Sequence, residues 1–450
     1  MKTKSGHPLF KKKKELTPNQ ILVLGFLGII SIGTYLLQHP ISSSSGISIE
    51  LLDALFTATS ATCVTGLIVL DTGKDFSLFG QWVILILFQI GGLGIMTFST
   101  MFAFLLGRKI SLRQRLLIQE SLNQFSIGGL VRLAKYIIVF TIFFEGLGTL
   151  LLYINWSNLT SVHNHLFLSF FHAVSAFCNA GFSLFSDSLE QFNLNIGINL
   201  IFLILIVFGG IGFLVLVELF EFPKKHRLSL HSKLVLVVTI VLLITGAVGI
   251  YLLEKNNSAT LQPMLLKGRI LTSLFQSTTA RTAGFNTISV EQLGNSTLFF
   301  LIILMFIGAS PTSTGGGIKT TTFSIAFLWM YYTLKGRRHL YLFCRQISST
   351  IMNKAWAILM LSLSWTLMMT LLISYYEKFD FIELFFEIIS AFGTVGLSTG
   401  ITSQLSPAGK IIIILTMFLG RLGPLSLALS LIINRHPESI QYPEGHIMVG

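Results

Sequence analysis

Ser60-Ala-Thr-Cys-Val-Thr-Gly66-Leu67 is one of four similar stretches that decide the fold of this chain. The other three are Ser175-Ala-Phe-Cys-Asn-Ala-Gly181-Phe182, Thr278-Thr-Ala-Arg-Thr-Ala-Gly284-Phe285 and Ser390-Ala-Phe-Gly-Thr-Val-Gly396-Leu397. Each stretch ends in a glycine followed by a bulky apolar residue. The glycines lie 115, 103 and 112 residues apart. This spacing is too long for a solenoid repeat but suits a repeated unit of two membrane helices with a loop between them.

The composition indicates an integral membrane protein. Hydrophobic residues make up 52% of the 450 residues, charged residues only 11%, and the mean hydropathy is +0.76. Soluble domains average about 25% charged residues, whereas a helix needs about 20 apolar residues to cross a bilayer. Eight segments meet that length, and we predict spans at residues 18–38, 80–106, 131–153, 196–222, 231–253, 296–334, 353–375 and 407–434.

Shorter apolar and aromatic runs lead into the four glycine stretches. They begin at Leu52, Leu166, Leu271 and Phe381, and each lies between two predicted spans. At about 10 to 13 residues they are too short to cross a bilayer and suit re-entrant half-helices. We therefore expect an all-α integral membrane protein with four repeats of helix, half-helix with loop, and helix. Its eight transmembrane helices and four half-helices would surround one central pore.

The charge distribution predicts the orientation. Lys and Arg number 22 in the segments expected on one side and six in the connections on the other, so the positive-inside rule places both termini in the cytoplasm of a cell-membrane protein. Eleven of the 19 acidic residues fall in the outer connections, where they would attract cations. The expected divisions are a basic N-terminal segment at 1–17, repeats at 18–106, 131–222, 231–334 and 353–434, and a C-terminal tail at 435–450.

The repeated glycine needs a reason in the backbone. Because it has no Cβ, glycine adopts positive φ without strain, and such a turn can direct carbonyl groups toward a common axis. Four loops of this kind around one axis predict a ring of carbonyl oxygens, which can replace the hydration shell of a cation.

The sixth predicted span is interrupted. It contains Pro311 and three consecutive glycines, Gly315-Gly-Gly317, which break a helix within the membrane. A nucleotide-binding P-loop is excluded, because that motif has glycine directly before its lysine and lies between a strand and a helix. Here Ile318 separates Gly317 from Lys319, and both flanks are apolar spans.

Three basic residues, Arg281, Lys319 and Arg421, lie within predicted membrane segments, where a cation costs roughly 2.5–3.5 kcal/mol. Arg421 in the eighth span lies at a level similar to the break in the sixth. We expect the break to close the pore below the glycine loops as a mobile loop, with Arg421 donating hydrogen bonds to it in the closed state. The residues assigned to this gate are Thr314, Gly315, Gly316, Gly317, Lys319 and Arg421.

Two acidic residues also lie at membrane depth. Glu387 precedes Gly396 by nine residues, and we expect it to form an ion pair with Arg281 of the adjacent repeat behind the loops. Glu145 in the third span is expected to make a structural hydrogen bond, although its partner cannot be identified from the sequence.

No pattern typical of an enzyme is present. Cys63, Cys178 and Cys344 show neither a disulfide framework nor a metal-binding spacing, and the histidines are scattered. We expect no catalytic residues and no metal other than a transported ion.

The four loops, the Thr394-Val-Gly396 sequence, the break and Arg421 together resemble the Ktr/Trk/HKT superfamily of potassium transporters, and its bacterial Ktr membrane subunits most closely. The resemblance covers nearly the whole chain. It implies a K⁺ filter to which each loop contributes one wall. The filter residues so implied are Val64, Thr65, Gly66, Asn179, Ala180, Gly181, Thr282, Ala283, Gly284, Thr394, Val395 and Gly396.

The resemblance also implies an assembly in the lipid bilayer. It implies a homodimer in which each protomer has its own pore, standing on a cytosolic nucleotide-binding ring of the RCK type supplied by another polypeptide. It implies neither an organic cofactor nor a nucleic-acid partner. The Thr-Val-Gly-Tyr-Gly of tetrameric potassium channels is absent, so some Na⁺ is expected to pass or bind. Plant members that prefer Na⁺ have serine in place of the first-loop glycine, and Gly66 points to K⁺.

The expected function is K⁺ uptake across the cell membrane through a gated, channel-like pore. Two alternatives stay open from the sequence. One is a strictly Na⁺-coupled K⁺ symporter of the same fold, and the other is a membrane scaffold or sensor that conducts no ions.

Overall fold

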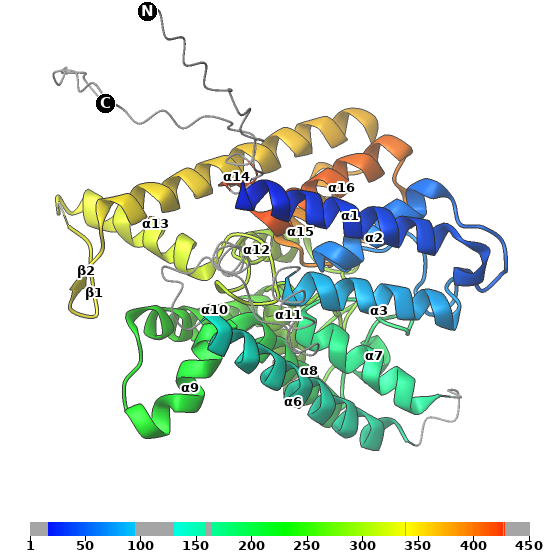
Figure 1. The fold of residues 1–450 in the computed structure, drawn as a ribbon, viewed down its shortest axis with the longest axis horizontal. Helices are drawn as coiled ribbons and strands as arrows, with labels where there is room; N and C mark the ends of the chain where they lie inside the picture. Colours follow the sequence, from blue (N-terminus) through cyan, green and yellow to red (C-terminus); the bar gives the residue numbers. More distant parts are fainter. Residues whose placement is uncertain (1–16, 95–129, 158–163, 338, 426, 428–450) are drawn as a thin grey trace, which may run out of the picture.

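The computed structural model describes residues 17–94, 130–157, 164–337, 339–425 and 427, which form a bundle of helices with one small β-hairpin (Figure 1). Most of the predicted N-terminal segment 1–17, the tail 435–450 and the second half of the predicted span 80–106 lie outside the described residues.

Four long helices carry a membrane-spanning pattern by length and composition. They are α1 (Pro18–Gln38), α6 (Leu130–Trp156), α10 (Leu230–Glu254) and α14 (Ser349–Tyr376). A capping box begins α1, because the Thr17 side chain accepts from the Gln20 N–H and the Gln20 side chain accepts from the Thr17 N–H. Ile32, Ile142 and Leu371 on these helices are 62%, 67% and 71% exposed. Contact with lipid explains this exposure of large apolar side chains.

Each long helix is followed by a shorter helix that ends at one of the glycine stretches. The short helices are α2 (Leu51–Cys63), α7 (His165–Cys178), α11 (Leu266–Thr279) and α15 (Phe381–Gly393). They contain 13 or 14 residues, which is too few to cross a bilayer. A further apolar helix follows each loop: α3 (Leu78–Leu93), α8 (Ile196–Ile211), α12 (Asn295–Phe306) and α16 (Pro407–Leu422).

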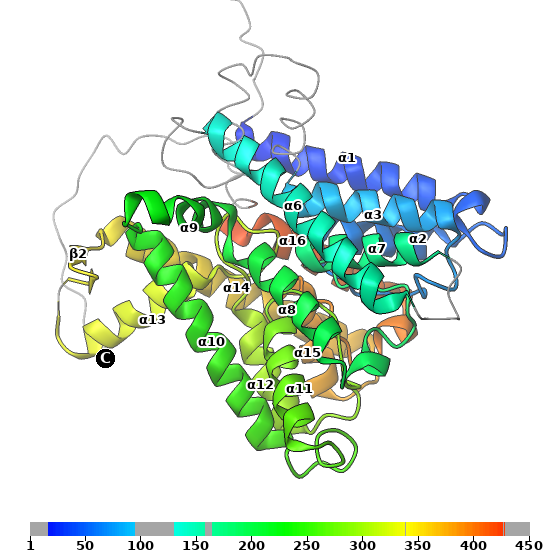
Figure 2. The same ribbon diagram turned by 90° about the horizontal axis from the view of Figure 1, so that it is seen from below.

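The four sets of helices close on themselves. Helix α3 packs against α7, α8 against α11, α12 against α15, and α16 against α2. Each of these helices therefore contacts the short helix of the next set, and the last set contacts the first. In Figures 1 and 2, α16 lies beside the helices of the first set although it is near the other end of the described chain. This arrangement brings the four glycine stretches together.

The helices that follow the loops end at corresponding places. Helices α3, α8 and α16 stop immediately before Gly94, Gly212 and Gly423, whose φ angles are 80°, 102° and 83°. Helix α12 stops at Phe306, and a helix resumes only at α13 (Thr320–Leu334). The interruption predicted in the sixth span is therefore confirmed.

The predicted span over residues 196–222 is bent and does not form one continuous helix. Helix α9 (Phe213–Lys225) turns away from α8 by 101°. The turn occurs at Gly212, where positive φ is accessible to glycine without strain. The Phe213 N–H then donates to the Thr312 carbonyl oxygen in the break after α12 (2.9 Å). The bend is therefore stabilised by a contact between two distant segments, which local hydrophobicity does not encode.

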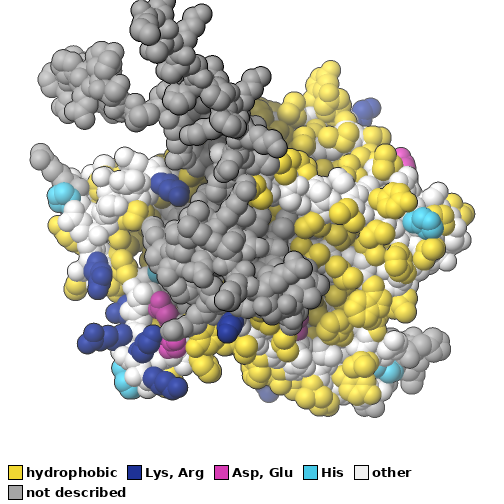
Figure 3. All heavy atoms as spheres, in the orientation of Figure 1, with side chains coloured by type: hydrophobic (Ala, Val, Ile, Leu, Met, Phe, Trp, Pro, Cys, Tyr) yellow, Lys and Arg dark blue, Asp and Glu magenta, His cyan; other side chains and the backbone are white. Residues whose placement is uncertain are grey.

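Short elements complete the fold. They are the 3-10 helices η1 (Pro40–Ser42), η2 (Glu190–Phe192) and η3 (Thr402–Gln404), and the antiparallel strands β1 (Tyr341–Leu342) and β2 (Arg345–Gln346), in which Tyr341 pairs with Gln346. Figure 3 shows Lys and Arg side chains gathered near the hairpin and α9, and a broad hydrophobic surface on the opposite side of the same view. This separation suits a protein whose basic end lies at the edge of a bilayer.

Candidate functional site

The four glycine stretches share one backbone conformation. Their glycines have φ of 87° (Gly66), 72° (Gly181), 75° (Gly284) and 90° (Gly396). The residue two positions earlier is also left-handed in every loop, with φ of 59° (Val64), 57° (Asn179), 85° (Thr282) and 49° (Thr394). The positive φ predicted for the glycines is confirmed. Two left-handed residues separated by one residue turn each chain sharply where a short helix ends.

Each glycine lies beside a carbonyl oxygen of the next loop. The pairs are Gly66 with Ala180, Gly181 with Ala283, Gly284 with Val395, and Gly396 with Thr65. A Cβ built on Gly66 would lie 2.5 Å from the Ala180 oxygen, and one on Gly284 would lie 2.6 Å from the Val395 oxygen. These distances are too short for any side chain. The fourth pair returns to the first loop, so the four backbones form a closed ring.

The ring forms the floor of an acidic cavity. All four glycines line a cavity of about 420 Å³, together with Asp71, Asp187 and Glu190. The side chains of the eight other predicted filter residues are buried. The loops can therefore offer a cation backbone oxygens. Burial and the negative charge of Asp187 raise the pKa of Glu190, although the hydrogen bond from Asn286 (3.1 Å) opposes this shift.

The break after α12 contacts the second and fourth loops directly. The Asn179 side-chain amide donates to Thr314 Oγ1 (2.9 Å), and the Gly316 N–H donates to Thr394 Oγ1 (3.1 Å). Asn179 and Thr394 are the left-handed residues of the second and fourth loops. The break therefore lies directly against the ring.

Backbone hydrogen bonds hold the break to the ends of two helices. The N–H groups of Ser310 and Thr314 donate to the carbonyl oxygens of Gly210 (3.0 Å) and Gly209 (3.2 Å) at the end of α8. The Gly317 N–H donates to the Gly420 oxygen of α16 (3.4 Å). These bonds satisfy a non-helical backbone at membrane depth, as a low-dielectric environment requires.

Arg421 joins the break to a third helix. One guanidinium nitrogen donates to the Thr314 carbonyl oxygen, and the other donates to the carbonyl oxygens of Gly91 and Gly92 (3.2 Å) at the end of α3. The predicted contact between Arg421 and the break is confirmed. Lys319 Nζ donates to the Gly315 oxygen (2.7 Å) within the break. The residues assigned to the gate thus lie together beneath the ring.

The predicted ion pair between Arg281 and Glu387 is absent from the described residues. The Arg281 guanidinium donates to Thr239 Oγ1 in α10 (3.5 Å). The Glu387 carboxylate accepts hydrogen bonds from three groups of the segment that follows its own loop: Ser398 Oγ, the Thr399 N–H (3.3 Å) and Thr402 Oγ1 (3.0 Å). Local donors satisfy Glu387, so it needs no cation from the adjacent set. The support of the filter by these two residues remains a prediction.

The partners of two residues, Arg421 and Glu145, were not fully predicted from the sequence. Gly91 and Gly92 are the acceptors for Arg421, and the repetition of Gly-Gly-x-Gly at 91–94 and 209–212 was a signal for them. Glu145 accepts a hydrogen bond from Gln89 Nε2 (2.9 Å). The structural hydrogen bond expected of Glu145 is therefore confirmed, and a polar Gln89 in an apolar helix was the clue to its partner.

Comparisons with known proteins identify the family and the fold of the chain. The chain is 42% identical over 434 residues to the Ktr system potassium uptake protein B of Bacillus subtilis, covering 96% of this chain and 97% of that protein. It is 37% identical over 444 residues to the potassium/sodium uptake protein NtpJ of Enterococcus hirae, and this match covers 97% of this chain and 98% of NtpJ. The chain also matches the solved structure of the potassium transporter TrkH from Vibrio parahaemolyticus, with a TM-score of 0.73 and 18% sequence identity. This match covers 95% of this chain and 87% of the TrkH chain.

The resemblance to the Ktr/Trk/HKT superfamily is thus confirmed, and the fold is the helical membrane fold of TrkH. Because the sequence model of the TrkH family, described as cation transport proteins, matches residues 5–441, the chain belongs to this family.

Proposed function

We propose that this multi-pass membrane protein takes up K⁺ through one central pore surrounded by its four sets of helices. The observation that carries the proposal is the closed ring in which each glycine meets a carbonyl oxygen of the next loop. Such oxygens can replace the water around a desolvated K⁺. The name of the 42% identical relative, a potassium uptake protein, supports K⁺ as the ion.

The driving force and the surroundings of the ring favour inward movement of a cation. One charge gains about 2.3 kcal/mol per 100 mV of membrane potential. The short helices α2, α7, α11 and α15 end at the loops, so the negative ends of their dipoles are directed at the ion. Asp71, Asp187 and Glu190 of the cavity, on the expected outer side, raise the local cation concentration.

The break between α12 and α13 is the proposed gate. Within this non-helical segment, residues 307–319, Thr314 and Gly316 form hydrogen bonds with Asn179 and Thr394 of the loops, and Thr314 also accepts from Arg421. In this proposal the described conformation is the closed state. Opening moves the break aside and replaces these hydrogen bonds by others, in a shift between two states that differ by a few kcal/mol.

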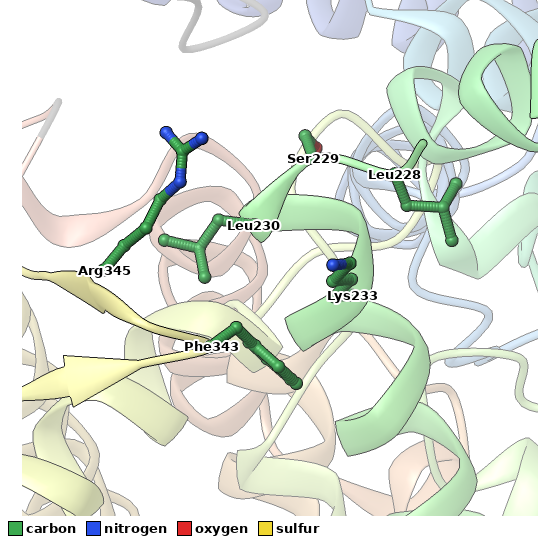
Figure 4. Close-up of a pocket in the computed structure, with 6 residues that line it drawn as sticks. All are labelled: Leu228, Ser229, Leu230, Lys233, Phe343 and Arg345. Carbon is green, nitrogen blue, oxygen red and sulfur yellow. The ribbon is translucent and has the colours of Figure 1, made fainter. Parts of the chain in front are cut away.

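Control from the cytoplasm is part of the proposal. A cytosolic nucleotide-binding ring of the RCK type would act on a homodimer of this chain, both termini being cytoplasmic. Lys233 and Arg345 line a cavity of about 240 Å³ between the start of α10 and the β-hairpin, on the expected cytoplasmic side (Figure 4). A basic face there suits contact with an acidic surface of such a partner.

A flux measurement in reconstituted vesicles tests the proposal. With K⁺ and Na⁺ varied independently, a channel-like pathway carries K⁺ in the absence of Na⁺. The name of the relative NtpJ, a potassium/sodium uptake protein, favours strict Na⁺ coupling as the second candidate, and K⁺ flux that requires Na⁺ would support it. Vesicles that carry neither ion, with or without the regulatory partner, would favour a scaffold or sensor and overturn both transport proposals.

A further inference from the structure

A buried carboxylate lies outside the ring and the break. Glu145 is in the middle of α6, one of the four long spans, and is only 8% exposed. Its carboxylate accepts a hydrogen bond from Gln89 Nε2 of α3 (2.9 Å). An acidic residue at membrane depth is costly to insert and is a candidate for a functional role.

Gln89 connects this carboxylate to the end of α3. It precedes Gly91 and Gly92, whose carbonyl oxygens accept the hydrogen bonds of Arg421. Gly91 N–H and C=O groups belong to the last turn of α3, which ends at Leu93. The position of that turn decides whether the two oxygens meet the Arg421 guanidinium. A side chain that holds Gln89 in position therefore also holds the Gly91 and Gly92 carbonyl oxygens, which accept from Arg421, in position.

Gln89 also contacts the second glycine loop. Its Oε1 accepts from Cys178 Sγ (3.1 Å), and a Cβ on Gly92 would lie 3.0 Å from the same sulfur. The next residue, Asn179, donates to Thr314 Oγ1 in the break.

These contacts form a closed circuit. The end of α3 binds Arg421, Arg421 binds the Thr314 carbonyl, the Thr314 hydroxyl binds Asn179, and Cys178 returns to Gln89 on α3. Glu145 is attached to this circuit at two points, because its carboxylate accepts from Gln89 Nε2 (2.9 Å) and, at the longer distance of 4.0 Å, from Cys178 Sγ.

We infer that Glu145 is a positioning residue for the closed gate. Through Gln89 it holds the end of α3 where the Gly91 and Gly92 oxygens receive Arg421. The inference rests on the proposed gate and assigns to it a residue that belongs to neither the ring nor the break. Glu145 acts by accepting a hydrogen bond, so an uncharged acceptor of the same size preserves the effect.

The test measures K⁺ flux into vesicles that contain the full chain without a regulatory partner. Removing the acceptor in Glu145→Ala should raise this flux about 3- to 10-fold, the factor that corresponds to one net hydrogen bond. Glu145→Gln keeps an amide oxygen for Gln89 and should stay near the parent flux. Thr141→Ala is the matched control, because Thr141 is also buried in α6 and its hydroxyl has no hydrogen-bond partner among the described residues.

A double variant separates positioning from general damage. If Glu145 acts through Arg421, then Glu145→Ala adds nothing to the flux of Arg421→Ala, since coupled residues give non-additive effects. Independent addition of the two increases would overturn the inference, as would parent flux in a folded Glu145→Ala protein. If Glu145→Ala does not fold, Gln89→Met, which has a similar volume and no N–H donor for Glu145, must give the same increase.

Failure of the inference and failure of the proposed gate give different results. Deletion of Ser313–Gly317 removes the centre of the break itself. If this deletion raises partner-free flux and Glu145→Ala does not, the gate stands and the role of Glu145 is wrong. If the deletion leaves the flux unchanged in a folded protein, the break is not a gate, and a role for Glu145 in closing it is excluded as well.

Discussion

Arg421 donates a hydrogen bond to the backbone carbonyl oxygen of Thr314, a residue 107 positions earlier in the chain. The bond joins α16 to the break after α12. The second guanidinium nitrogen reaches Gly91 and Gly92 of α3, so a single side chain links three segments beneath the ring. A planar group with several fixed donors is suited to this task.

Replacement of Arg421 by alanine should open the pathway. The variant loses the bonds to Thr314 and α3, and each hydrogen bond from a charged donor contributes roughly 1.5–3 kcal/mol. We expect partner-free K⁺ flux to rise by on the order of tenfold or more, measured in reconstituted vesicles.

Arg421→Lys distinguishes geometry from charge. Lysine keeps the positive charge but has no planar fork to reach both acceptors. If the hydrogen bonds hold the gate closed, Arg421→Lys should show flux between the parent and Arg421→Ala. Parent-like flux in Arg421→Lys would mean that charge repulsion alone blocks the pore.

Serine in place of the loop glycines should weaken discrimination between K⁺ and Na⁺. The loss should be large at Gly66 and Gly284, where a Cβ would come within 2.5 Å and 2.6 Å of a carbonyl oxygen, and smaller at Gly181, where the nearest atom is 3.1 Å away. Positive φ adds strain at all three positions. Competition of Na⁺ with K⁺ flux measures the effect.

Gly28→Ser is the matched control for the loop variants. Gly28 lies in α1, and a Cβ there meets no atom within 4 Å. It should leave selectivity unchanged. If Gly66→Ser and Gly284→Ser behave like Gly28→Ser, the loops do not form the filter.

The sequence predicted the parts of the fold that depend on local rules. The helix break follows from Pro311 and the glycines at 315–317, and the positive φ at Gly66 follows from its repetition in an apolar loop. The contact of Arg421 with the break followed from the need of a buried guanidinium for acceptors. In each case one residue type has few physical options in a membrane.

The choice between distant partners could not be predicted in the same way. Glu387 had Arg281 as a plausible counter-charge, yet the hydroxyl groups of Ser398 and Thr402 reach it first. The bend at Gly212 depends on the break some hundred residues later in the chain. Both outcomes are determined by how the four sets of helices close around one axis, and sequence periodicity does not contain that information.

Arg281 and Glu387 should therefore act independently. They share no hydrogen-bond partner among the described residues, so the effects of Arg281→Gln and Glu387→Gln on stability should add within about 0.5 kcal/mol. Thermal unfolding of the two single variants and the double variant measures this coupling. An interaction energy above about 1 kcal/mol would restore the ion pair that the sequence suggested.

Glu190 should make K⁺ uptake sensitive to acid on the outer side. Burial and Asp187 raise the pKa of Glu190, against the hydrogen bond from Asn286. As the pH falls, Glu190 is therefore neutralised before an ordinary glutamate, whose pKa is about 4.3, and the cavity loses one negative charge. A unit charge about 10 Å from an ion in water contributes about 0.4 kcal/mol, which corresponds to a flux decrease of about twofold.

Glu190→Gln should remove this sensitivity. At neutral pH and low ionic strength its flux should equal that of the acidified parent. The decrease in flux that the parent shows at pH values above the pKa of an ordinary glutamate should be absent from the variant. The difference should vanish at about 1 M salt, where the screening length is about 3 Å. Glu50→Gln is the control, because Glu50 is an exposed residue that precedes α2 and should have a smaller effect. Equal effects of both variants would mean that Glu190 contributes only to the general surface charge and not to the cavity above the ring.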